Sequence, residues 1–173
     1  MASNHTAGTA ARTFAPSELC QRMLAKTSKG TCGPCILYLE DGTIFYGRAC
    51  GAEGTATGEV CFNTSLEGYF EVMTDPSYAG QIVTMTYPQI GNYGIDETDV
   101  QSAFPGDAVR SASAPAMRGM IVRDMCATPS NWRSAVSVPE YLRAHGIVAI
   151  EGVDTRALVR HLRDNGSKMG IIS

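Results

Sequence analysis

The chain of 173 residues lacks the hallmarks of several large protein classes. No apolar run approaches the roughly 18 residues that a helix needs to cross a bilayer, so we expect no membrane-spanning helix. Residues 1–30 contain no apolar core of the kind found in a secretory signal. Charged residues are scarce, at 18%, and 14 Lys and Arg against 17 Asp and Glu give a net charge of −3. That balance does not favour a nucleic-acid-binding protein, which normally shows a basic excess.

Several short catalytic and cofactor-binding motifs are also missing. Neither Gly-x-Gly-x-x-Gly nor Gly-x-x-x-x-Gly-Lys-Ser/Thr occurs, so the sequence predicts no dinucleotide or P-loop phosphate site. No cysteine is flanked by glycine at both −2 and +2, the pattern of a nucleophile elbow. None of His5, His145 and His161 begins a His-x-Glu. We therefore expect no catalytic residue and no cofactor-binding residue within this chain.

Six cysteines are present, and two of them form the sequence Cys32-Gly33-Pro34-Cys35 of thioredoxin-like redox sites. That chemistry needs the first thiol at a helix N-terminus, where the helix dipole lowers the thiol pKa. A strand hairpin follows instead, which does not favour this chemistry. A thiol–disulfide protein using Cys32 and Cys35 is therefore kept only as an alternative hypothesis. A zinc site would need a second paired knuckle, which Cys50 and Cys61 do not supply, so we predict no metal site. Free thiols in apolar surroundings indicate an intracellular protein.

Residues 1–35 differ in composition from the rest of the chain. They are rich in Ser, Thr, Ala and Gly, and Glu18 is their single acidic residue. We predict a disordered N-terminal extension over 1–35, followed by one domain over 36–173. The alternative is a mitochondrial presequence, because such segments are poor in acids and contain Arg and Ser.

The first half of the domain has the two-residue period of strands. Residues 36–39 and 44–46 form a predicted hairpin that turns at Asp41-Gly42. Further strands are predicted at 59–64, 81–86 and 119–123.

The last third changes to helical period. Ser137 is positioned to cap a helix that ends at Gly146, and Asp154 to cap a second helix that ends at Gly166. A strand follows each helix, at 147–150 and 168–172. The pattern predicts an α/β fold, a layered β/β/α domain with mixed sheets and helices packed on one side.

Polar loops separate the predicted strands, at 62–69, 75–78 and 91–94. Functional residues gather on such loops when rigid strands hold them, although ordinary turns have the same composition. On the second helix, His161 is interpreted as part of a surface face. Arg156 and Arg163 could pair with neighbouring carboxylates or could face a partner.

These loops belong to a longer series of short sequence motifs that follow one another along the chain. The stretches are LEDGT (39–43), GEVCFNTS (58–65), GYFE (68–71), TDPSYAGQIVT (74–84), TYPQIGN (86–92), SNWR (130–133) and GVDTRAL (152–158). Together they resemble the N-terminal domain of the small (glutaminase) subunit of carbamoyl-phosphate synthetase. The resemblance covers about residues 35–173 and leaves the Cys32/Cys35 pair and the N-terminal extension unexplained.

The resemblance implies a fold of layered sheets and a part in making carbamoyl phosphate from glutamine, bicarbonate and two ATP. It implies that Ser77, in the Asp-Pro-Ser-Tyr loop, contacts the glutamine substrate. The Cys–His–Glu glutaminase domain and the synthetase unit that uses ATP and Mg are not in this chain. We therefore expect the chain to be inactive alone and to dock against those domains as its partners.

Other features of the resemblance leave alternatives open. It implies a ligase with glutamine amidotransferase activity in the cytoplasm, with neither a nucleic acid nor a membrane as partner. Arginine and pyrimidine biosynthesis both fit. A pure interaction module that touches no substrate is the remaining alternative.

Overall fold

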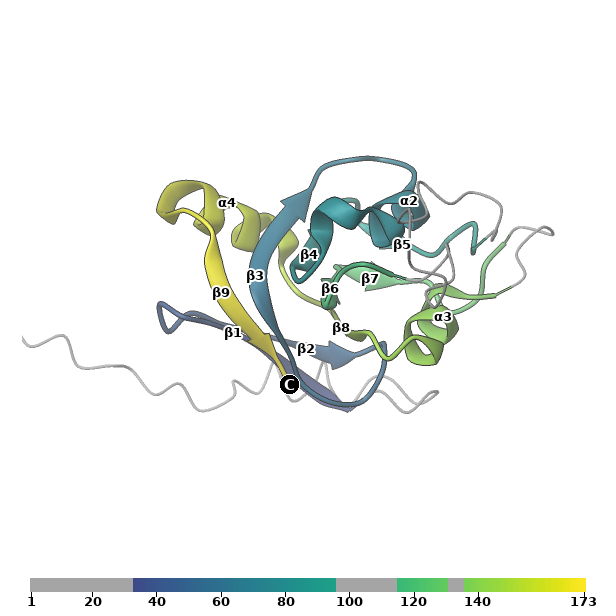
Figure 1. Cartoon of the computed structure of the whole chain (residues 1–173), viewed down its shortest axis with the longest axis horizontal. Helices are drawn as coiled ribbons and strands as arrows, with labels where there is room; N and C mark the ends of the chain where they lie inside the picture. The colour runs from purple at the N-terminus through teal and green to yellow at the C-terminus, as the bar shows by residue number, and fades with distance from the viewer. Residues whose placement is uncertain (1–32, 96–114, 131–135) are drawn as a thin grey trace, which may run out of the picture. The chain divides into compact units, whose positions relative to one another are not determined.

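The structure is a computed structural model that describes residues 33–95, 115–130 and 136–173 (Figure 1). The chain divides into residues 1–30 and 31–173, and the described residues all fall in the second unit. Cys32 and nearly all of the predicted N-terminal extension therefore lie outside the described residues. The first strand begins at Pro34, so the last residues assigned to that extension belong to the sheet.

Seven strands form one mixed sheet that closes on itself into a barrel. In spatial order they are β1 (Pro34–Leu39), β2 (Ile44–Ala49), β8 (Val148–Glu151), β6 (Gly119–Ile121), β4 (Ile82–Met85), β3 (Ala56–Asn63) and β9 (Lys168–Ile172). The pairs β3–β4, β4–β6 and β6–β8 are parallel, and the others are antiparallel. Strand β9 closes the sheet because it pairs with β1 on one side and β3 on the other.

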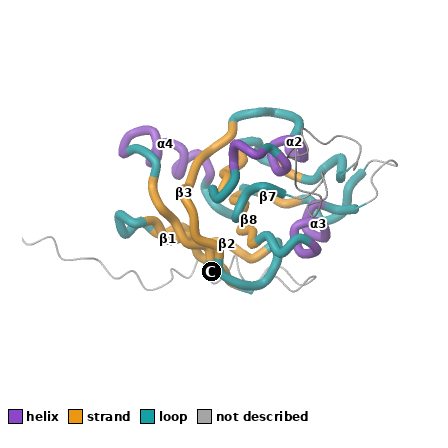
Figure 2. Tube along the Cα trace, in the orientation of Figure 1, coloured by secondary structure: helices purple, strands orange, loops and turns teal. Residues whose placement is uncertain are grey.

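The remaining elements are short helices and a small second sheet (Figure 2). They are α2 (Tyr69–Thr74), the 3-10 helix η1 (Pro76–Tyr78), α3 (Val138–Ala144), α4 (Thr155–Asn165), β5 (Gln89–Ile90) and β7 (Asp124–Met125). Figure 1 shows α4 beside β9 and β3, whereas α2 and α3 lie toward the other side of the barrel. The mixed sheet with helices against it confirms the predicted α/β class.

Two hydrophobic cores share the parallel strands. The interior core collects inward residues of the barrel strands together with Leu158 and Leu162 of α4. The outer core lies between the barrel wall and the helices α2 and α3. Because strand side chains alternate between faces, Ile82 enters the interior core and its neighbour Val83 enters the outer one.

Local signals in the sequence account for α3 and α4. Ser137 and Glu140 form a capping box at the start of α3, and Asp154 accepts the Ala157 N–H at 3.0 Å at the start of α4. Both predicted caps are confirmed.

The interpretation of 62–69 as a loop without helix is wrong at its end, because α2 begins at Tyr69. Its N-cap residue is Gly68, which has no side chain to cap the helix, so the sequence carries no capping signal there.

Candidate functional site

The loop that carries Ser77 is a single turn of 3-10 helix held by its own side chains. Asp75 caps η1, and its Oδ1 accepts the backbone N–H of Ser77 at 2.8 Å as well as the Ser77 hydroxyl. Pro76 occupies the first turn, where its fixed φ suits the helix. Ser77 itself is exposed, so this rigid turn presents its hydroxyl to the surroundings of the domain.

Strand β3 fixes the position of this loop. The side-chain amide of Asn63 donates to the Tyr78 hydroxyl at 2.9 Å. Gly58 packs so closely on the loop that a Cβ at residue 58 would lie 2.5 Å from the carbonyl oxygen of Gly80. Gly80 adopts φ +83°, a backbone conformation that favours glycine. The glycines at 58 and 80 therefore let the Ser77 loop rest directly on the strand.

A cavity of about 630 Å³ opens beside the end of the same loop. Ala79 and Gly80 form one part of its wall, and segments 55–57, 115–118 and 145–148 form the rest. His145, at the end of α3 as predicted, contributes to this wall, and its Nδ1 lies 2.9 Å from the Tyr141 carbonyl oxygen. The cavity makes the surface next to Ser77 concave.

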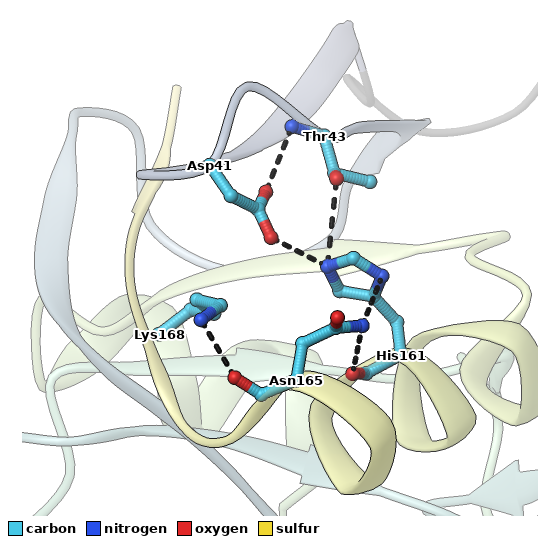
Figure 3. Close-up of polar contacts among 5 residues, drawn as sticks. All are labelled: Asp41, Thr43, His161, Asn165 and Lys168. Atoms are coloured by element: carbon cyan, nitrogen blue, oxygen red, sulfur yellow. Dashed lines mark hydrogen bonds and ion pairs between the residues drawn. The ribbon is translucent and has the colours of Figure 1, made fainter.

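His161 joins α4 to the turn between β1 and β2 (Figure 3). Its Nε2 lies 2.6 Å from Asp41 Oδ2, and Asp41 Oδ1 accepts the Thr43 N–H at 3.0 Å. Burial raises the pKa of the Asp41 carboxyl, but the hydrogen bonds from Thr43 and His161 outweigh it and lower the pKa from 3.8 to about 2. The predicted surface histidine thus has a tertiary partner. Asn165 supports it by donating from its side-chain amide to the His161 carbonyl oxygen at 2.9 Å.

The surroundings of Cys35 and Cys61 do not suit thiol redox chemistry. Cys35 is buried in β1 rather than at a helix N-terminus, and burial raises its pKa. Burial and the nearby Glu59 carboxylate raise the pKa of Cys61 to about 11. These surroundings disfavour the thiolate and count against the thiol–disulfide hypothesis.

The described residues contain neither a cluster of potential metal ligands nor a membrane-spanning helix. Among the described residues, no group of three or more His, Cys, Asp and Glu is placed to hold a metal ion. No helix in that part of the chain is long and apolar enough to cross a membrane.

An apolar face covers the outside of three neighbouring strands. It consists of Ile36, Tyr38, Ile44, Tyr46, Met169 and Ile171, whose exposed fractions run from 37% to 50%. Strand pairing sets Ile36 opposite Tyr46, and Tyr38 opposite both Ile44 and Ile171. Contiguous exposed apolar side chains of this kind mark contact surfaces. This face was not predicted from the sequence, although the alternation of residues within each strand was an available signal.

A second cavity, of about 520 Å³, lies along α4 and is rich in arginine. Arg156 and Arg163, the two arginines considered from the sequence, line it together with Arg123 and Arg160. Arg123 and Arg160 were not assigned to a site from the sequence. The spacing of 156, 160 and 163 on one helix face was the available signal.

These features define a closed α/β barrel domain with an exposed Ser77 loop, an exposed apolar face and an arginine-lined cavity. Residues 37–172 match the family model for "Carbamoyl-phosphate synthase small chain, CPSase domain". The chain belongs to that family, which confirms the resemblance drawn from the sequence.

Curated relatives agree over the same region. Carbamoyl phosphate synthase small chains from Syntrophotalea carbinolica, Solidesulfovibrio magneticus and Thermotoga maritima are 56%, 55% and 52% identical over 138 residues. Each alignment covers 80% of this chain and 33% or 34% of the relative. The chain therefore spans about a third of the length of these relatives.

Proposed function

We propose that this chain is the N-terminal, non-catalytic domain of a glutamine-dependent carbamoyl-phosphate synthetase. The observation that carries the proposal is the match of residues 37–172 to the small-chain family, in which the relatives are about three times as long as the matched stretch. In this proposal a glutaminase domain releases ammonia from glutamine. A synthetase unit then combines that ammonia with bicarbonate at the expense of two ATP, with Mg. The domain alone is inactive and binds no cofactor.

Ser77 contributes to glutamine binding in this proposal. Its hydroxyl donates to Asp75, which leaves the oxygen lone pairs free to accept an N–H of glutamine. Rotation away from Asp75 lets the same hydroxyl donate to a carboxylate or a carbonyl oxygen. Because Ser77 is exposed on a rigid turn, it can reach a substrate held by a neighbouring domain.

The partners proposed are the glutaminase domain and the synthetase unit of the same enzyme, in the cytoplasm. The apolar face of β1, β2 and β9 supports docking, since burial of its six side chains would remove apolar surface from water. The product would enter arginine or pyrimidine biosynthesis.

The test is the substitution Ser77→Ala in the complete enzyme, assembled from a full small chain with this domain and its synthetase unit. Loss of a hydrogen bond to the substrate, worth about 1–3 kcal/mol, should raise the KM for glutamine roughly 5- to 150-fold. Synthesis driven by free ammonia should be unchanged, because it bypasses glutamine.

Ser65→Ala is the matched control, since Ser65 is another exposed serine in a loop after β3. This control should leave the KM for glutamine unchanged. If Ser77→Ala behaves like the control, the role of Ser77 is disproved, and the domain would serve as an interaction module instead.

A further inference from the structure

The cavity beside α4 concentrates positive charge in a chain that is negative overall. Four of the 14 lysines and arginines line this one cavity, while the whole chain carries a net charge of −3. The other lining residues are Thr64, Thr86, Pro88, Thr155 and Val159, so none of the described lining residues is acidic. Guanidinium groups are always protonated, and their mutual repulsion favours an anion between them.

Three of the arginines occupy one face of a helix. Positions 156, 160 and 163 are spaced by four and three residues, which places them side by side along α4. Arg123 follows β6 and completes the group from the barrel. Among the described residues, none of these four arginines forms an ion pair, in contrast to Arg48, which binds Glu151 at 3.0 Å.

The apolar contacts of the helix hold this charged face in place. Leu158 and Leu162, on the opposite side of α4, are buried in the interior core. The Arg163 guanidinium lies 5.3 Å from the centre of the Phe62 ring, within the range of a cation–π contact. The arginines therefore belong to a fixed helix face rather than to a loop.

We infer that this arginine-lined cavity is the docking site for an acidic, carboxylate-bearing surface of the synthetase unit. All four arginines are exposed, which suits carboxylates presented by another protein better than a small ligand that needs enclosure. Thr86 follows β4 and Ser77 precedes it, so the cavity and the Ser77 loop lie toward opposite ends of that strand. The Ser77 end is assigned to the glutaminase domain, which leaves the arginine end for the synthetase unit. This inference rests on the proposed function.

The test compares association of the full small chain with the synthetase unit before and after charge reversal. Arg156→Glu with Arg160→Glu should weaken the Kd by roughly tenfold or more and flatten its dependence on salt, because like charges would then face each other. Arg156→Gln with Arg160→Gln should shift the Kd in the same direction by less. Arg143→Glu, on the exposed side of α3, is the matched control and should leave the Kd unchanged.

Thermal unfolding of each variant checks that the fold is retained. We expect it to be retained because the substituted side chains are exposed. An unchanged Kd in folded charge-reversed protein overturns the inference. So does a result in which inorganic phosphate stabilises the wild-type small chain, charge reversal removes that effect, and subunit association stays the same. If the wild-type chains do not associate at all, the proposed function fails instead.

Discussion

At the scale of single residues, Asp41 connects two elements that lie far apart in the sequence. It lies at the tip of the β1–β2 hairpin, where a turn residue would ordinarily contact only its own loop. Its two carboxylate oxygens instead bond to Thr43 within the turn and to His161 on α4. One side chain thereby fastens the hairpin to the helix that covers the interior core.

Asp41→Asn tests the contribution of this carboxylate to stability. The folded-state pKa of about 2 lies below the ordinary value of 3.8, so the ionised carboxylate stabilises the fold above about pH 4. That stabilisation is lost as the pH falls through 2. We expect Asp41→Asn to lower the Tm at pH 7 and the difference from wild type to shrink steadily between pH 4 and pH 2.

Glu40→Gln is the control for this measurement, because Glu40 is an exposed acid beside Asp41. Its Tm should follow the wild type at every pH. A Tm difference for Asp41→Asn that is constant across the acid range would show that the bonds of the carboxylate do not depend on its charge.

At the scale of elements, the contact between β3 and the Ser77 loop links the sheet to the proposed substrate contact. Gly58→Ala would place a methyl group against the Gly80 carbonyl, which must move to make room. We expect a loss of stability of about 1–3 kcal/mol from overpacking. In the complete enzyme the KM for glutamine should rise although Ser77 itself is intact.

Urea unfolding and glutamine titrations measure the two effects. Gly33→Ala is the matched control, because a Cβ at residue 33 would meet nothing within 4 Å. If Gly58→Ala destabilises the domain and leaves the KM for glutamine unchanged, the position of the loop does not govern substrate binding.

The sequence was most informative about elements whose causes are local. The Asp41-Gly42 turn and the caps Ser137 and Asp154 are short-range patterns, and the structure confirms the hairpin and both helices. The helix α2 was missed because it forms through burial of Tyr69, Phe70 and Met73 in the outer core rather than through a cap. Closure of the sheet was also missed, since the pairing of β9 with β1 and β3 is nonlocal.

The candidate surfaces, too, were predictable from the sequence only where their signal is local. Ser77 was named through the family resemblance, and the Asp75 cap that orients it is visible in the sequence as Asp-Pro-Ser. The arginine cavity was not predicted as a site, because Arg123, which follows β6, and Arg156, on α4, line one cavity only in the folded domain.

At the scale of the whole domain, the two cores share the walls formed by β4, β6 and β8. Loss of packing in one core should therefore loosen the other, and unfolding should be a single transition. Leu39→Ala in the interior core and Leu142→Ala in the outer core should each cost about 2–5 kcal/mol.

Two spectroscopic signals test this coupling. Tyr69, Tyr93 and Tyr141 report on the outer core through near-ultraviolet circular dichroism, and far-ultraviolet circular dichroism reports on the whole domain. Both signals should shift to the same lower urea midpoint in Leu39→Ala, although the substitution lies in the interior core. Separate midpoints would show that the cores unfold independently.

The closure of the barrel by β9 also sets an order of events during synthesis. Ile36 and Ser173 exchange two backbone hydrogen bonds, at 2.9 and 3.1 Å, across the seam between the first strand and the end of the last. A nascent chain can form its first hairpin early, but the edges of β1 and β3 wait for β9 to leave the ribosome. Nonlocal pairing of this kind slows folding. Until the seam closes, the edges of β1 and β3 expose unpaired backbone groups that favour pairing with other chains.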